Sequence, residues 1–389
     1  MVRQERINTA VRLKERIESL QEEMVGDILS SGWSRAATYR RKLVTMLGEI
    51  ELRVIKLRNT QGDVVSPLLD ALSIRRRRYS NEVRMVCADM ASRLSYNDTK
   101  IELERTTGIS IPKRTIHSFV QEIGPRLKEA NEDVVRGEHP TTMIGDGTAV
   151  RSVYPTQNQV RVAITQENNH GTRRLYGLVV NAPWETVPRP DNPYILVSDA
   201  EPGLVDGLAS NQDDVQLDLV HAVKESLVKL WSEGMPKTQR DEVSTEMKRI
   251  LFTLVNSVKK HAGMREEYDA IEDRVRTTLE ELEKLAGDLA SRGYHAASSF
   301  ISKNARLMVT FAKLVTIGLH VPYTSNTIER LMGEVAKRCK HKWAHWSSRG
   351  LENMLWILLT RYVDVETYGA FWRRYIHALP TADRPQYPP

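Results

Sequence analysis

Cysteine is scarce in this sequence: Cys87 and Cys339 are the only two among 389 residues. Two cysteines exclude a disulfide scaffold and a four-cysteine zinc site, and they suit a reducing cytoplasm. Apolar runs are short, as at residues 355–359, whereas a membrane span needs about 18–20 apolar residues. The first residues are charged and no apolar stretch follows them. We therefore expect no secretion signal, no membrane partner and a cytoplasmic, nucleoid-associated location in a prokaryote.

Motifs for several common chemistries are also missing. The sequence has no P-loop, no Gly-x-Ser-x-Gly and no Gly-x-Gly-x-x-Gly. Neither sign of charge dominates, since 56 Lys+Arg face 50 Asp+Glu and the formal net charge is +6. So small an excess does not by itself indicate a nucleic-acid partner. With 41% hydrophobic and 27% charged residues, the composition is that of a folded globular protein.

The N-terminal part shows a change of hydrophobic period. Apolar residues recur every three or four positions over residues 1–30, which predicts a helix ended by Gly32. Apolar and charged residues then alternate over residues 44–58, with a slip between Val54 and Ile55 that suggests a bulge. A turn and Val64-Val65 follow, so we predict a small β-hairpin with a basic outward face.

Four consecutive arginines, Arg75, Arg76, Arg77 and Arg78, come next. A solvated loop is one interpretation. Phosphate contact is the other, because the guanidinium group matches phosphate oxygens.

The following segment has a helix-turn-helix layout, with helices predicted at residues 81–94, 97–106 and 112–123 and a break at Gly108. The last helix has a buried face of Ile116, Phe119, Val120 and Ile123. Its outward donors include Lys113, Arg114, His117 and Gln121. These side chains would suit base edges and phosphates. A short helical hairpin within a bundle is the alternative.

Residues 141–220 predict a sheet. Three strands at 143–150, 159–165 and 174–180 form a meander, followed by a strand at 194–198, a helix and a further strand at 216–220. This order is that of an RNase H-like core. The fold class is therefore α+β or α/β, with an all-helical insertion and an N-terminal helical and β-hairpin region for DNA binding. The predicted segments are 1–43 (helical), 44–78 (hairpin and basic loop), 79–139 (helix-turn-helix), 140–221 (core), 222–322 (helical insertion), 323–379 (C-terminal core helices) and 380–389 (flexible tail).

Three carboxylates form the candidate site. Asp146 lies mid-strand, where an uncompensated carboxylate is costly, and Asp199 ends a neighbouring strand. A helix from Thr327 offers Glu329 and Glu334. We choose Glu329 because it lies beside the apolar stripe with small neighbours. Three acids suit two Mg²⁺ or Mn²⁺ ions in phosphodiester chemistry.

These residues carry a resemblance to prokaryotic insertion-sequence DDE transposases of the mutator-like branch. The motifs are Asp146-Gly147-Thr148, Ser198-Asp199-Ala200-Glu201-Pro202-Gly203, Ser325-Asn326-Thr327-Ile328-Glu329-Arg330 and Asp218-Leu219-Val220-His221. A stretch from Lys342-Trp343 to Gly350 and the N-terminal region are also similar. The separation between Asp199 and Glu329 matches the helical insertion of that branch.

The resemblance implies a role for each residue. Asp146, Asp199 and Glu329 would be the catalytic metal ligands, with His221 and Asp218 near the active site. Further DNA contacts would come from Lys337, Arg338, Lys340, Trp343 and Trp346, although core packing is equally compatible with the two tryptophans.

We therefore predict a transposase that cleaves double-stranded DNA at the terminal inverted repeats of its element and joins the ends to target DNA. A homodimer or larger assembly is expected, because two element ends must be joined. One alternative is a non-catalytic DNA-binding protein derived from a transposase. Another is an RNase H-fold nuclease that cleaves without joining.

Overall fold

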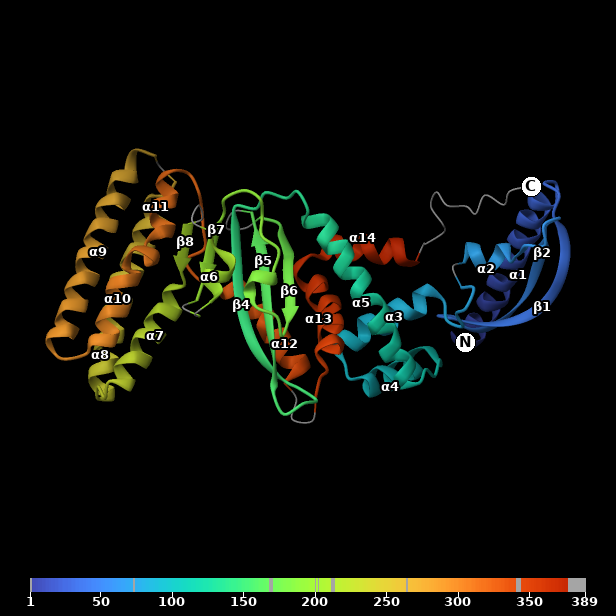
Figure 1. Ribbon diagram of the computed structural model, residues 1–389, viewed down its shortest axis with the longest axis horizontal. Helices are drawn as coiled ribbons and strands as arrows, with labels where there is room; N and C mark the ends of the chain where they lie inside the picture. The colour runs from blue at the N-terminus through green and yellow to red at the C-terminus, as the bar shows by residue number, and fades with distance from the viewer. Residues whose placement is uncertain are drawn as a thin grey trace. The chain divides into compact units, whose positions relative to one another are not determined.

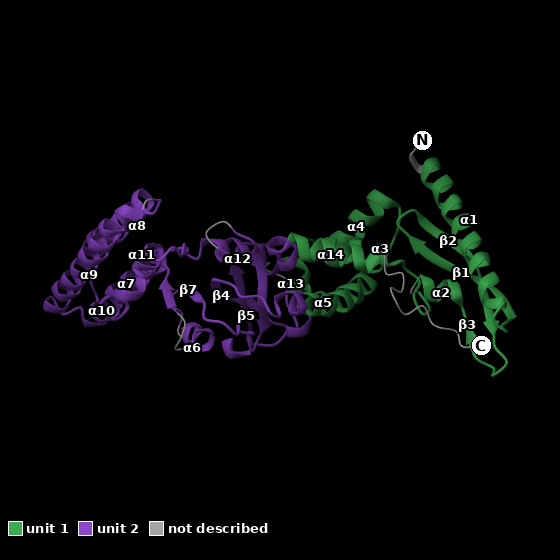
Figure 2. Ribbon diagram, turned by 90° about the horizontal axis from the view of Figure 1, so that it is seen from above, with its two compact units in different colours: residues 1–130, 353–358, 365–389 green, residues 131–352, 359–364 purple. Residues whose placement is uncertain are grey.

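The computed structural model describes residues 2–72, 74–167, 171–199, 201, 203–210, 214–263, 265–340 and 344–376. Contacts divide the chain into two compact units, distinguished by colour in Figure 2. Unit 1 comprises residues 1–130, 353–358 and 365–389, and unit 2 comprises residues 131–352 and 359–364.

Unit 1 begins with a helix that packs against a small antiparallel sheet. Helix α1 (Val2–Leu29) confirms the predicted N-terminal helix. The sheet contains β1 (Ser34–Thr45), β2 (Gly48–Arg58) and β3 (Val64–Val65) in the order β1-β2-β3. Gln21 of α1 donates to the carbonyl oxygen of Arg53 at 2.6 Å and accepts from the backbone N–H of Ile55 at 2.9 Å. These two bonds fix α1 against β2.

The hairpin differs from the prediction in its main partner. β1 pairs along the length of β2, whereas Val64–Val65 adds two residue pairs. β1 was missed because most of it is exposed and lacks apolar alternation. The irregularity in pairing lies between Arg35 and Ala37 of β1, so the bulge predicted at Val54 and Ile55 is wrong. Val54 and Ile55 are both buried because each belongs to a different apolar cluster.

Two ion pairs join the exposed side chains of β1 and β2. Arg40 pairs with Glu51 at 3.3 Å, and Lys42 pairs with Glu49 at 2.9 Å. Glu49 and Glu51 therefore pair with two cations of β1, while Lys and Arg remain in excess on the two strands.

The rest of unit 1 is helical. Helices α2 (Pro67–Ala71), α3 (Asn81–Arg93), α4 (Tyr96–Thr107) and α5 (Lys113–Val135) follow in order. Gly108 closes α4 with a φ of 71°, which confirms the predicted break. The predicted apolar face of α5 is buried, but the helix continues beyond residue 123. α14 (Val365–Ile376) joins this unit, where the Tyr368 hydroxyl donates to Asp89 of α3 at 2.7 Å.

The sheet of unit 2 has five strands in the order β6-β5-β4-β7-β8 (Figure 1). Its strands are β4 (Thr142–Arg151), β5 (Gln157–Gln166), β6 (Arg173–Val180), β7 (Ile195–Ser198) and β8 (Asp214–Leu217). The first three form the predicted antiparallel meander, and β7 and β8 add in parallel. The short helices η1 (Trp184–Thr186) and α6 (Leu204–Leu208) lie between strands. The last strand ends earlier than predicted, because Leu219 already begins a helix.

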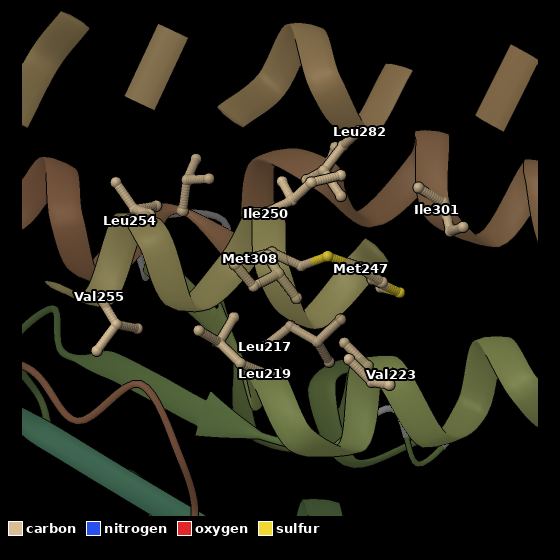
Figure 3. Close-up of a cluster of buried hydrophobic side chains, with 14 of the residues drawn as sticks. Leu217, Leu219, Val223, Met247, Ile250, Leu254, Val255, Leu282, Ile301 and Met308 are labelled. Carbon is tan, nitrogen blue, oxygen red and sulfur yellow. The ribbon is translucent and has the colours of Figure 1, made fainter. Parts of the chain in front are cut away.

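Five helices follow β8 and share one apolar core (Figure 3). They are α7 (Leu219–Ser232), α8 (Lys237–His261), α9 (Tyr268–Ser291), α10 (His295–Met308) and α11 (Thr310–Thr316), with η2 (Arg265–Glu267) before α9. Leu217 of β8 belongs to this core, and the backbone N–H of Phe311 donates to Gln216 at 2.7 Å. The helical insertion is thus packed onto the edge strand of the sheet.

Unit 2 also contains α12 (Asn326–Cys339), the first and last turns of α13 (Ser348–Val363) and the last turn of α5. None of the helices in the described ranges has the length and apolar character needed to cross a membrane.

Candidate active site

Asp146 and Asp199 lie on neighbouring parallel strands. β4 and β7 pair with Ile144 opposite Val197. Two residues further along each strand, the same register brings Asp146 level with Asp199, and adjacent strands are about 4.8 Å apart. Asp199 directly follows the end of β7 at Ser198. Asp146 and Asp199 therefore lie side by side where β7 ends, on inner strands of the sheet.

Asp146 faces the side of β4 that packs against α12. On the opposite side, a Cβ at Gly145 would lie 3.1 Å from Leu208 of α6. On the α12 side, Lys340 donates to the hydroxyl of Thr148 at 2.7 Å. Burial raises the pKa of Asp146 to about 6, and the negative charge of Asp199 adds to the effect.

Asp218 is a fully buried carboxylate whose acceptor positions are occupied. Its Oδ1 accepts the backbone N–H groups of Val220 at 2.7 Å and His221 at 2.8 Å. Its Oδ2 accepts the backbone N–H of Ser325 at 2.5 Å and the Ser325 hydroxyl at 2.8 Å. Burial alone would raise the pKa of Asp218. The contact with His221 and these hydrogen bonds outweigh burial and lower that pKa to about 2.

His221 lies between Asp218 and Glu329. Its Nδ1 is 3.4 Å from Oδ1 of Asp218, and its Nε2 is 3.6 Å from Oε1 of Glu329. The contact with Asp218 raises the pKa of His221, and partial burial opposes this rise. The first turn of α12 thereby places Glu329 beside the first turn of α7.

Asp218, His221 and Glu329 offer donor atoms within 4.8 Å of one another, which is compact enough to hold a metal ion. However, a carboxylate has about four lone-pair positions, and Asp218 already accepts four hydrogen bonds. Asp218 is therefore poorly suited to be a ligand. Among the described residues, Asp146, Asp199 and Glu329 do not form a second group of three donor atoms this compact.

The end of α12 contributes the predicted basic residues. Lys340 reaches Thr148, two residues from Asp146 on the same face of β4. Lys337 is exposed and pairs with Glu334 at 2.6 Å, so the other acid considered on this helix already has a partner.

Arg338 is buried, with its guanidinium 4.8 Å from the centre of the Trp346 ring. Trp346 is also buried, and its indole N–H donates to the carbonyl oxygen of Cys339 at 3.3 Å. Packing accounts for the position of both side chains. Trp343 lies outside the described residues.

Sequence reasoning missed two residues next to the site. Glu201 approaches β4 from the α6 side, where a Cβ at Gly147 would lie 3.2 Å from its Oε2. Burial raises the pKa of Glu201, and Asp199 raises it further. Ser325 is the second missed residue, through its bonds to Asp218. Both lie in motifs that carried the resemblance, and Ser325 precedes α12 as a typical helix N-cap would.

The predicted basic loop of unit 1 is mostly engaged in ion pairs. Three of its arginines pair with acids: Arg75 with Asp70 at 2.6 Å, Arg77 with Glu122 at 3.0 Å and Arg78 with Glu49 at 2.7 Å. Arg76 is exposed. Such pairs bind surface arginines weakly, so contact with phosphate would require exchange of partners.

The start of α5 presents Lys113, Arg114 and His117 to solvent, as predicted. Gln121 differs, because it is partly buried and accepts a hydrogen bond from the side chain of Asn353 at 2.7 Å. The prediction that Gln121 lies outward is therefore not met. α5 turns this position toward α13.

The model of one protein family, described as "Transposase, Mutator family", matches residues 8–364. Because this match spans most of the chain, the protein belongs to the Mutator family of transposases. The resemblance that the motifs indicated is thus confirmed, and a general function in DNA transposition follows. No curated protein matches the chain.

Proposed function

We propose that this transposase is a DDE enzyme in which Asp146, Asp199 and Glu329 form the catalytic site of an RNase H-like core. The observation that carries the proposal is the convergence of distant segments. The register of β4 and β7 sets Asp146 level with Asp199, and His221 lies 3.6 Å from Glu329. The charge of Asp199 raises the pKa of Asp146 and that of His221 lowers it.

The sheet supports the RNase H-like assignment. An antiparallel meander is extended by two parallel strands, and a helix packs on the central strand β4. The catalytic carboxylates lie on two adjacent strands and that helix. Ligands gather at such strand ends in open α/β sheets.

The donor set fits Mg²⁺ or Mn²⁺, because it consists of carboxylate oxygens with one imidazole at its edge. When bound, two such ions activate a water or 3′-hydroxyl and stabilise the leaving oxygen of an in-line displacement at phosphorus. Asp146, Asp199 and Glu329 would hold them. His221 would keep the Glu329 carboxylate oriented toward the site.

Lys340 would position the DNA backbone. Thr148 holds its ammonium group on the face of β4 that carries Asp146, two residues or about 7 Å along the strand. The cation would thus neutralise a phosphate near the one being cleaved.

Recognition of the element ends would fall to unit 1. Lys113, Arg114 and His117 are exposed at the N-terminal end of α5, and Gly108 separates α4 from α5. This arrangement supports a helix-turn-helix whose second helix meets the major groove. A dimer or larger assembly would bring two ends together for cleavage and strand transfer.

Incubation of the purified protein with DNA carrying the inverted repeats that flank its gene tests the proposal. Mg²⁺ or Mn²⁺ should give cleavage at the ends and joined products with target DNA. Glu329→Gln should abolish both, while Glu334→Gln on the same helix should leave them nearly unchanged. Cleavage without joining would favour a nuclease, and binding without cleavage would favour a non-catalytic DNA-binding protein. Normal cutting by Glu329→Gln would contradict the site.

A further inference from the structure

One carboxylate joins the two ends of the helical insertion. Asp218 caps the start of α7 by accepting the N–H groups of Val220 and His221. Its other oxygen accepts the backbone N–H and the hydroxyl of Ser325, which immediately precedes α12. The insertion therefore leaves the core and returns to it at opposite sides of a single side chain.

Ser325 has an unusual role for a serine at a helix start. Such a hydroxyl commonly accepts a hydrogen bond from its own helix, but Ser325 makes no such bond and donates to Asp218 instead. Its carbonyl oxygen accepts the backbone N–H of Glu329 at 3.1 Å. The position of Glu329 is thus tied through Ser325 to Asp218. The same two segments are also joined by a backbone hydrogen bond of 3.1 Å, from the N–H of Leu219 to the carbonyl oxygen of Tyr323.

Asp218 also contacts the segment that carries Asp199. Its backbone N–H donates at 2.8 Å to the carbonyl oxygen of Ser198, the residue before Asp199. Asp218 is 0% exposed, so water does not compete for these bonds. A buried carboxylate that accepts charge-assisted bonds from two elements fixes their separation more firmly than neutral groups would.

We infer that Asp218 is a positioning residue that sets His221 and Glu329 and holds the helical insertion in register with them. The effect of Asp218 on Glu329 as a catalytic group rests on the proposed function. The effect of Asp218 on the starts of α7 and α12 is independent of that proposal. Because the insertion begins and ends at this carboxylate, a displacement of α7 relative to α12 is transmitted directly to the first turn that carries Glu329.

Asp218→Asn is the direct test, because it keeps the shape and replaces one acceptor oxygen with a donor. Whichever way the amide turns, its NH₂ faces backbone N–H groups of Ser325 or of α7. Ser325→Ala is the milder variant, since it removes the hydroxyl bond and keeps the backbone bond. Asp241→Asn, at an exposed position of α8, is the matched control.

Hydrogen exchange measured on the full chain tests the connection independently of catalysis. In Asp218→Asn, amides of residues 219–223 and 326–330 should exchange about tenfold or more faster, while α9 keeps its protection. Faster hydrogen exchange at only one of the two helix starts, or at neither, would overturn the inference. If Asp218→Asn unfolds all of unit 2, Ser325→Ala decides: faster exchange at both starts supports the inference, and unchanged exchange at residues 219–223 overturns it.

Cleavage assays then test the effect on the site. The Mg²⁺ concentration for half-maximal cleavage should rise by about 10- to 100-fold in Asp218→Asn, as for other groups that orient metal ligands. If Asp218 served only to stabilise the fold, Asp218→Asn would lower the total amount of DNA cleaved and leave the Mg²⁺ midpoint unchanged. That result would overturn the positioning role. If the wild-type protein fails to cleave DNA with every divalent cation tested, the proposed function is contradicted. Hydrogen exchange would still decide whether Asp218 joins the two helix starts.

Discussion

Nε2 of His221 lies 3.6 Å from Oε1 of Glu329, although the whole helical insertion separates the two residues in sequence. On its other side, His221 contacts Asp218, which raises the pKa of the imidazole. A protonated imidazole attracts the Glu329 carboxylate and limits its rotation. The histidine thereby connects a buried structural carboxylate to one that faces solvent.

His221→Gln should slow DNA cleavage about tenfold, because Glu329 loses the partner that orients it. Binding of end DNA, measured without divalent cations, should be unchanged, since the basic surface is intact. His295→Gln, at the exposed start of α10, is the control. A wild-type cleavage rate in His221→Gln would show that Glu329 does not depend on the imidazole.

Asp146→Asn should stabilise the metal-free protein at pH 8. Burial raises the pKa of Asp146 to about 6, whereas an unfolded aspartate titrates near 3.8. The folded state therefore binds the carboxyl proton of Asp146 more tightly than the unfolded state does. The contribution of this group to the free energy of unfolding is fully present below pH 4 and is lost as the pH rises through 6. The ionised carboxylate then destabilises the folded state by up to about 3 kcal/mol, a cost that the amide avoids.

Chemical denaturation at several pH values, in the presence of a chelator, measures this effect. The gain should vanish below pH 4, where both chains are neutral at this position. Asp206→Asn, at an exposed position of α6, should show no comparable gain. A destabilised Asp146→Asn at pH 8 would contradict the assigned burial cost.

Asp218 should have the opposite pH dependence. Its pKa is lowered to about 2, so its stabilising contribution is present above pH 4 and lost as pH falls toward 2. Asp218→Asn should be less stable by about 2 kcal/mol at pH 7, and the difference should narrow in acid. Acid titrations of both chains followed by circular dichroism check this expectation. A constant difference between pH 7 and pH 2 would refute it.

Lys340→Ala should weaken binding of end DNA and reduce the slope of log K against log salt by about one, because one phosphate contact is lost. Lys337→Ala is the matched control on the same helix, since Lys337 already pairs with Glu334. Fluorescence anisotropy at several salt concentrations gives both slopes. Equal effects of the two variants would mean that Thr148 does not select Lys340 for this contact.

The strands around the candidate site could be predicted because their side chains alternate between two environments. Val160, Val162 and Ile164 of β5 point into a core, and the alternation is visible in the sequence. β1 could not be predicted in this way, since its outer residues contact solvent and its register comes from pairing with β2. Gln121 was misplaced because its helical face is apolar only in part, and Asn353, which binds it, is remote in sequence.

The sequence by itself determined which acids were available and on which kinds of element they would lie, because periodicity and strand order are local properties of the chain. Tertiary structure alone decided what each acid does. Asp218 accepts four hydrogen bonds and is retained as a structural anion, whereas Glu329 is left facing His221 and solvent. The reason is physical: the chemistry of a carboxylate depends on the donors around its oxygens, and two of the four donors to Asp218 come from Ser325, 107 residues away in sequence.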